Sequence, residues 1–336
     1  MAFYVGQCHA TIIPDPRVKF AEVRLHIPID PNLPIDQAYH YFLHHKYSRP
    51  SAGYSDGAHT LAQVLEAIGR NRQYIALTLN CRYDLGEKTF RVASPGAYVA
   101  AARCAVRAMD EFRLTGFINL WSEPGLRFGI NGKDLRTWLD AVSEIVRMHG
   151  YQMGGIGEEW IHPHAQENFD TTIKSGKIDI LTVHCLSDSI KRIEKYKEIW
   201  KGPIAVLETG SQREEYDYRI SKGVKKIEEI VEYAYSHRNK VITCGIVYAD
   251  SSALEDKNFV MRMWSGDYKK IRWTTPTWHK FIGLVQRYSD SLPKPQPEPE
   301  EDEMKLGIYK VGSRGVVTKF VQRCLVNEGL KPGSID

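Results

Sequence analysis

Acidic residues directly follow several short apolar stretches of this chain, an arrangement that can present carboxylates for acid–base or nucleophilic chemistry. Glu123 stands in NLWSEPG, where Pro124 breaks the stretch at once, and Glu208 ends the apolar part of GPIAVLETGS. Further acids follow two other stretches: Glu158 with Glu159, and Asp250. A lone carboxylate at such a place is more simply a turn or capping residue. Catalysis therefore depends on whether the fold brings two of these acids together.

Eight short, β-branched apolar stretches predict the strands that position these acids, and amphipathic patterns typical of helices lie between them. The predicted strands are Tyr4–Ile12, Ala21–Ile27, Tyr74–Leu79, Phe117–Trp121, Gln152–Ile156, Ile178–His184, Ile204–Leu207 and Val241–Val247. The predicted helices are 95–112, 133–150, 187–202, 222–237 and 277–290.

Alternating strands and helices favour a parallel sheet, and eight strands are the number that closes a (β/α)8 TIM barrel of about 250 residues. The gap between the first two predicted strands is too short for a helix, and we expect the Tyr- and His-rich stretch 30–60 to be an elaborated loop over one barrel end. The rival is an open doubly wound sheet, which the lack of a G-x-G-x-x-G motif after a strand disfavours. In a barrel, Glu123 and Glu208 would follow the fourth and seventh strands, which face each other across the mouth.

Composition narrows the classes of partner and compartment. The chain has 336 residues, with 45 basic and 41 acidic side chains and no Lys/Arg block, which disfavours nucleic-acid binding. No apolar run is long enough to cross a bilayer, so no membrane partner is expected. The six cysteines have no metal or redox spacing, and we interpret them as reduced and structural. The N-terminal residues lack a basic leader and a cleavage-like site, which predicts no signal peptide and synthesis in the cytoplasm.

The strand-end motifs resemble those of clan-A (family-five-like) retaining glycoside hydrolases. That family carries Asn-Glu-Pro after strand four, and this chain has Ser122-Glu123-Pro124. It ends strand seven with an apolar run, Glu and a small residue, as in 206–210 here. An arginine on strand two and a histidine on strand six complete the resemblance, at Arg24 and His184. The resemblance spans roughly 4–288 in strand order.

The resemblance implies double displacement, in which Glu208 attacks the anomeric carbon and Glu123 is the acid and then the base. Retention needs the two carboxyls about 5–5.5 Å apart. Arg24 would keep Glu208 ionised. The expected substrate-binding residues are Arg24, Asn80, Trp121, Ser122, Trp160, His184 and Tyr248. The three aromatic side chains are candidates for stacking on a sugar ring. Packing in the core is at least as good an explanation for each of them. No cofactor and no metal is expected.

Two departures from the family pattern concern the substrate more than the reaction. Ser122 is shorter than the usual asparagine, and Leu186 stands where a tyrosine often follows the histidine. We expect a polysaccharide substrate, with a cell-wall glycan first and a plant-type β-glucan or mannan close behind. A barrel that binds glycan without hydrolysing it is an alternative from another class. A third is a metal-dependent hydrolase that uses the histidines at 40, 44, 45, 162 and 164.

The composition changes after the last predicted helix. We expect a (β/α)8 catalytic domain over 1–288, an extended Pro/Glu-rich linker over 289–304 and a short helical tail over 305–336. The tail resembles the first half of the peptidoglycan-binding domain of cell-wall hydrolases, at Gly312, Ser313, Gly315, Thr318, Val321, Gln322 and Leu325. The layout resembles that of phage endolysins, which implies a bacterial cell wall as partner and action there after release. The simpler alternative is an amphipathic helix that packs on the barrel.

Overall fold

The computed structural model describes most of the first unit of the chain. The described residues are 1–7, 13–25, 29–44, 59–84, 90–125, 130, 132–158, 163–185, 189–209, 220–246 and 276–292. The chain divides into two units, Met1–Leu292 and Pro293–Asp336, and the second lies outside the described residues together with most of the predicted linker and the whole predicted tail. Within the described residues, no helix is both long and apolar enough to cross a membrane.

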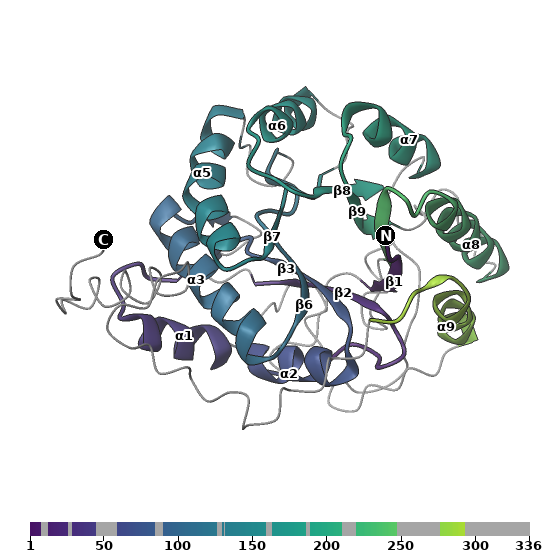
Figure 1. Ribbon diagram of the computed structural model, residues 1–336, viewed down its shortest axis with the longest axis horizontal. Helices are drawn as coiled ribbons and strands as arrows, with labels where there is room; N and C mark the ends of the chain where they lie inside the picture. The colour runs from purple at the N-terminus through teal and green to yellow at the C-terminus, as the bar shows by residue number, and fades with distance from the viewer. Residues whose placement is uncertain are drawn as a thin grey trace, which may run out of the picture. The chain divides into compact units, whose positions relative to one another are not determined.

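Eight parallel strands form the centre of the first unit, surrounded by helices (Figure 1). The strands are β1 Tyr4–Gln7, β2 Phe20–Arg24, β3 Tyr74–Thr78, β6 Thr115–Asn119, β7 Gln152–Gly154, β8 Leu181–Cys185, β9 Ile204–Thr209 and β10 Val241–Ile246. Their order in the sheet is β7-β6-β3-β2-β1-β10-β9-β8. Parallel bridges from Gly154 to Ile180 and from Glu158 to Val183 join the two edges. The fold is therefore the predicted (β/α)8 barrel, and each of the eight predicted strands is present.

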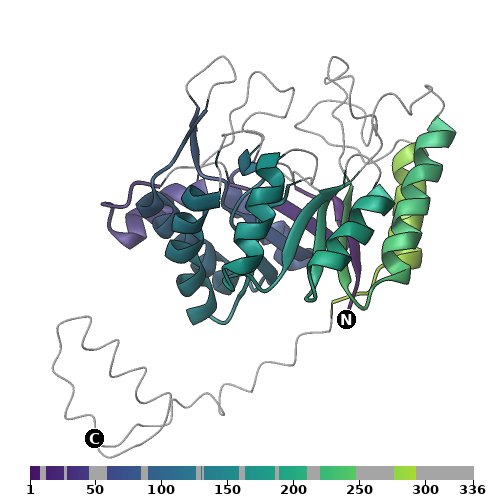
Figure 2. The ribbon, with the colours of Figure 1, turned by 90° about the horizontal axis from the view of Figure 1, so that it is seen from above.

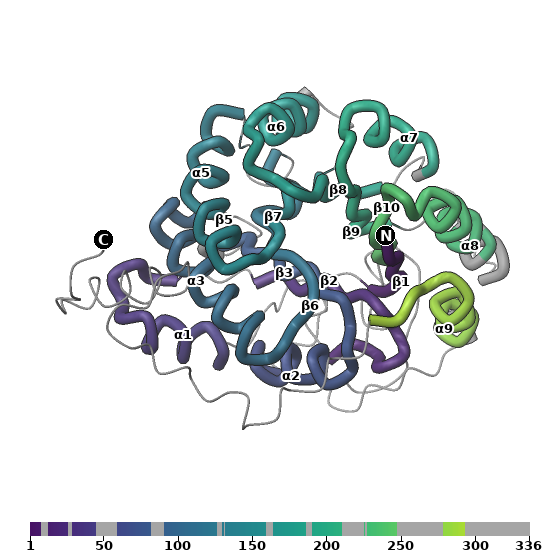
Figure 3. Tube along the Cα trace, in the orientation of Figure 1, coloured from purple at the N-terminus to yellow at the C-terminus, as the bar shows by residue number. Residues whose placement is uncertain are grey.

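Helices pack along the outside of the strands, as the side view in Figure 2 shows. They are α1 Ile35–His44, α2 Leu61–Asn71, α3 Pro95–Glu111, α5 Gly132–Met148, α6 Pro163–Lys174, α7 Ser189–Ile199, α8 Ile220–Ser236 and α9 Pro276–Tyr288. The last helix, α9, lies beside the first strand (Figure 3), where the amide of Phe3 donates to the Asp290 carboxylate over 2.8 Å. The five predicted helices are present, with ends that differ by a few residues.

Helices α1, α2 and α6 and one two-stranded hairpin were not predicted. The stretch 30–60, expected as a loop, contains α1, which buries Ala38, Tyr39 and Phe42 on one face. Polar and histidine residues dilute this face in the sequence, which hid the helical period. Helix α6 and a small antiparallel hairpin after β3, formed by β4 Arg82–Asp84 and β5 Phe90–Val92, were also missed. The short connection between β1 and β2 has no helix in its described part, as predicted.

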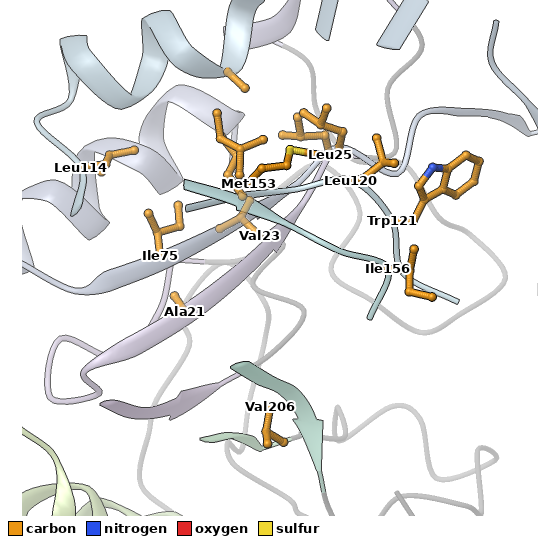
Figure 4. Close-up of a cluster of buried hydrophobic side chains, with 14 of the residues drawn as sticks. Ala21, Val23, Leu25, Ile75, Leu114, Leu120, Trp121, Met153, Ile156 and Val206 are labelled. Atoms are coloured by element: carbon orange, nitrogen blue, oxygen red, sulfur yellow. The ribbon is translucent and has the colours of Figure 1, made fainter. Parts of the chain in front are cut away.

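Side chains of the strands alternate between two apolar clusters. The outward cluster fills the space between strands and helices, and Figure 4 shows part of it, including Val23, Ile75 and Val206. The inward cluster, which we call the barrel floor, closes the interior toward the strand beginnings; it consists of Tyr4, Phe20, Ala76, Phe117, Ile180, Ala205, Leu207 and Ile242. Burial of this large apolar surface is the main force that holds the barrel closed. Polar side chains follow the floor along the same strands.

Candidate active site

A β-bulge in β9 determines where the Glu208 side chain points. Leu207 belongs to the barrel floor, so regular alternation would send Glu208 outward toward the helices. The pairing register shifts at this point against both neighbours, between Val183 and His184 on β8 and between Cys244 and Ile246 on β10. Such an extra residue re-aims a side chain. Glu208 consequently turns inward, where it is 4% exposed.

Glycine at 245 makes room for this bulge. A Cβ atom at Gly245 would lie 2.1 Å from the Leu207 carbonyl oxygen and 3.0 Å from the ring of Phe20. No other residue fits that contact without moving the backbone of β9. The inward direction of Glu208 thus depends on a small residue in the neighbouring strand.

Glu123 reaches the same interior from the loop after β6. Its backbone has φ +56°, in the left-handed region, and its amide donates to the Gly157 carbonyl oxygen over 3.0 Å. A non-glycine residue in that region costs about 1–2 kcal/mol. Glu123 is only 6% exposed. Backbone strain and a buried carboxylate at one residue are typical of functional sites.

His184 contacts both carboxylates. Its Nδ1 lies 3.2 Å from Oε1 of Glu123 and 3.1 Å from Oε2 of Glu208. A carboxylate oxygen of each glutamate and a ring nitrogen of His184 all lie within 4.8 Å of one another. Burial lowers the pKa of His184, but the negative charges of Glu208 and Glu123 outweigh it, so that pKa is raised above its usual value. Two acids therefore share one protonatable imidazole.

Arg24 supplies the fixed positive charge of the site. Its Nη2 donates to Oε2 of Glu208 over 2.8 Å and lies 3.4 Å from Nε2 of His184. On its other side it forms a two-bond ion pair with Glu22, from Nε to Oε1 and from Nη2 to Oε2, both 3.0 Å. The Arg24 side chain is 2% exposed and Glu22 is fully buried. A buried ion pair of this geometry needs such multiple bonds to offset desolvation.

The structure brings four of the predicted site residues together and places three others nearby or elsewhere. Arg24, Glu123, His184 and Glu208 form the contacts given above. Asn80 and Ser122 are buried in the segments that follow β3 and β6, and Asn80 has φ +35°. The Ser122 hydroxyl has no hydrogen-bond partner among the described residues.

Trp121 lies in the core instead. Its ring is fully buried, stacks on Tyr98 of α3 at 5.0 Å between centroids and meets Trp138 of α5 edge-on. Neither ring face is open to a ligand, which contradicts the prediction of a sugar-stacking Trp121 and agrees with core packing. Trp160 and Tyr248 lie outside the described residues, as do Glu159 and Asp250. The Glu158 carboxylate accepts from Asn168 of α6 over 3.3 Å.

Glu22 is the site residue that the sequence reasoning missed. The pattern that could have revealed it is the spacing of Glu22 and Arg24, two charges at period two within an otherwise apolar strand. Residues at that spacing share one face of a strand. Since parallel barrel strands are buried on both faces, a charged pair there must be paired inside the barrel.

A metal ion is poorly suited to this cluster. Glu123, His184 and Glu208 form the one group of three ligand-type side chains within the described residues whose atoms could converge on a cation. The guanidinium of Arg24, however, already bonds Glu208 and stands next to His184, and its charge would repel the ion. The rings of His40 and His44 contact each other in a tilted arrangement, 4.3 Å between centroids, on the solvent side of α1.

Comparisons with known proteins show the fold. No protein-family model matches the sequence, and no curated protein is significantly similar to it. A glucosidase from Croceicoccus marinus shares the fold with a TM-score of 0.57 at 12% identity, over 85% of this chain and 66% of that one. An endo-beta-1,4-glucanase variant from Xanthomonas axonopodis pv. citri gives 0.53 at 12%, over 85% and 99%. A GH128 endo-beta-1,3-glucanase from Pseudomonas viridiflava gives 0.53 at 9%, over 84% and 97%.

Proposed function

We propose that this protein is a retaining, endo-type β-glycosidase that hydrolyses internal bonds of a polysaccharide by double displacement. The observation that carries the proposal is the unequal pairing of two buried carboxylates: Glu208 bonds the permanent cation Arg24 in addition to the titratable His184, whereas the contact described for Glu123 is with His184. The first environment keeps a carboxylate ionised for attack, and the second suits a group that must give up and regain a proton. The solved structures that share the fold are named as glycosidases, which supports the same reaction class.

The proposed cycle has two steps. The Glu208 carboxylate attacks the anomeric carbon while Glu123 donates its proton to the departing glycosidic oxygen, which leaves a glycosyl ester on Glu208. Glu123 then takes a proton from a water molecule, whose oxygen attacks the same carbon and releases Glu208. One oxygen of each carboxylate lies within 4.8 Å of the other, which is compatible with the carboxyl separation of about 5–5.5 Å that retaining enzymes use.

For the substrate we propose a cell-wall glycan that carries 2-acetamido sugars. Serine at 122, in place of the family's asparagine, leaves room beside the sugar 2-position, and the resemblance of the tail to a wall-binding module points to the same polymer. An unsubstituted β-glucan is the second candidate. It is favoured by the two glucanases that share the fold and by the Ser122 hydroxyl, which has no hydrogen-bond partner among the described residues and can bond a 2-hydroxyl through water.

The test is a screen of purified protein against cell walls, chitin-type polymers, β-1,3- and β-1,4-glucans and mannans, with reducing ends as the readout. Proton NMR of the first product then gives the anomeric configuration. Release of β-anomers supports retention, and α-anomers would show inversion. Activity on glucans or mannans alone removes the acetamido proposal and leaves the glycosidase. Binding to a polymer without new reducing ends makes the protein a glycan-binding barrel.

A further inference from the structure

A continuous chain of hydrogen bonds crosses the barrel interior directly above the floor. Thr78 of β3 donates its hydroxyl to Oε1 of Glu22 over 2.9 Å, and Asn119 of β6 donates from Nδ2 to the Thr78 hydroxyl over 3.2 Å. Thr182 of β8 donates to Oδ1 of Asn119 over 2.9 Å, and the Gly157 amide donates to the Thr182 hydroxyl over 2.9 Å. The chain thus spans four strands and ends at Glu22.

All donors in this chain point the same way. The hydroxyls of Thr182 and Thr78 and the side-chain amide of Asn119 each accept from the far side and donate toward Glu22, so the dipoles add and strengthen one another at the final acceptor. Glu22 accepts from Thr78 on one side and from two nitrogens of Arg24 on the other. A carboxylate held from both sides in a fully buried layer has one orientation. That orientation in turn fixes the guanidinium plane of Arg24.

The proposed reaction requires Glu22 as a second carboxylate beside Arg24. In the resting site Arg24 is buried between two anions, Glu22 and Glu208. When Glu208 becomes a glycosyl ester it loses its charge, and of the two carboxylates that bond Arg24 it is Glu22 that stays ionised. Leaving one member of a buried ion pair alone is strongly unfavourable. Glu22 keeps the Arg24 charge compensated through the intermediate.

We propose that Glu22 is a positioning residue of this site: it orients Arg24 toward Glu208 and remains its counter-anion while Glu208 is esterified. The proposal has a kinetic part and a geometric part. The kinetic part, compensation of Arg24 during esterification, rests on the glycosidase function proposed above. The geometric part is that Glu22 controls how Arg24 is shared between two carboxylates, and it does not depend on that function. Two measurements separate the two parts.

The kinetic test compares Glu22→Gln with Glu22→Asp and with Glu158→Gln. The first removes the counter-anion at constant size, the second keeps the charge, and the third removes a different buried carboxylate, the one that bonds Asn168. We expect Glu22→Gln to slow formation of the glycosyl ester by roughly ten- to hundredfold, followed with an activated 2-deoxy-2-fluoro glycoside, with KM changed far less than kcat. Glu22→Asp should recover part of that loss, and Glu158→Gln should match the unmodified protein.

The second measurement needs no substrate. NMR titration of the His184 ring reports on Glu208, because that carboxylate raises the pKa of His184 and Arg24 lowers it. Without Glu22 the guanidinium has one carboxylate fewer to compensate and offsets the Glu208 charge more strongly, so the pKa of His184 should fall in Glu22→Gln and stay in place in Glu158→Gln. An unchanged His184 titration in a folded Glu22→Gln protein overturns the proposal. A shifted titration in a protein that hydrolyses no glycan would retain Glu22 as the residue that positions Arg24 and reject the glycosidase.

Discussion

The barrel floor and the layer above it are built from the same strands, yet they have opposite chemistry. Phe20 and Glu22 are two residues apart on β2, and Phe117 and Asn119 are two apart on β6. The same step leads from Ala76 to Thr78 and from Ile180 to Thr182. Residues two apart share a strand face, so both members of each pair point into the barrel. The first member packs in the apolar floor, and the second takes part in hydrogen bonds or ion pairs.

The difference separates stability from chemistry in a single interior. The floor gains free energy from every apolar group it buries. The layer above buries three carboxylates, a guanidinium and an imidazole, whose desolvation offsets most of their mutual attraction. Substitutions in the two layers should therefore affect different measurements, and the following predictions test that contrast.

Glu208→Gln should have the largest effect. The amide cannot form the glycosyl ester, so turnover should fall by roughly 10⁴-fold or more, while thermal unfolding shows an intact fold. Turnover is measured as hydrolysis of the polymer that gives the highest activity in the screen, and thermal unfolding is followed by circular dichroism. Full activity in this variant rejects Glu208 as the nucleophile; Glu158→Gln is the matched control for loss of a buried acid.

Glu123→Ala should separate substrates by their leaving groups. Loss of a general acid typically costs about 10²–10⁴-fold, and the loss should apply to polymers and to aryl glycosides with poor leaving groups. Glycosides with acidic phenols need no protonation and should react at nearly the unmodified rate in the first step. Equal losses on both kinds of substrate would contradict the acid role.

Phe117→Ala probes the floor. Removing a buried aromatic ring there should lower the free energy of unfolding by about 3–5 kcal/mol, measured by urea denaturation. The kcat of the protein that remains folded should change little, because the ring lies below the polar layer. A large loss of kcat at full stability would show that the two layers are not separable.

His184→Gln tests the protonation of the shared imidazole. The pKa of His184 is raised in the folded protein, so its charge stabilises the fold fully below its ordinary pKa of about 6.5, and this contribution is lost as pH rises through the folded value. The stability advantage of the unmodified protein over the variant should therefore be larger at about pH 6 than at a pH above the folded pKa. A difference that is constant with pH would mean that folding leaves the pKa of His184 unchanged, and one that shrinks as pH falls would mean that the imidazole stays neutral in the fold.

The smallest effect concerns the backbone of residue 123. With φ +56°, Glu123→Gly should be more stable than Glu123→Ala by about 1 kcal/mol, since only glycine adopts this conformation without strain. Both variants lack the carboxylate, so the comparison isolates the backbone. Equal unfolding midpoints for the pair would show that the left-handed conformation carries no cost.

The sequence predicted the barrel because its strands are short, apolar and regularly spaced, which is a local property. It predicted that Glu123 and Glu208 could meet because the order of the strands determines which strand ends face each other across the barrel mouth. The core position of Trp121 was undecided, since an aromatic residue after a strand looks alike whether a helix or a ligand covers it. The spacing of Glu22 and Arg24 marked a charged pair inside the barrel, but the role of Glu22 also depends on three side chains from other strands, a contact pattern that the local sequence does not encode.

The β9 bulge sets a condition on transplanting this site to another scaffold. Copying the letters IAVLET onto a straight, idealised strand would aim the glutamate at the surrounding helices, because regular alternation assigns it there. The graft must also carry the extra residue of the register shift and the glycine at 245 that admits the Leu207 carbonyl. A designer would therefore have to treat two adjacent strands as the smallest portable unit.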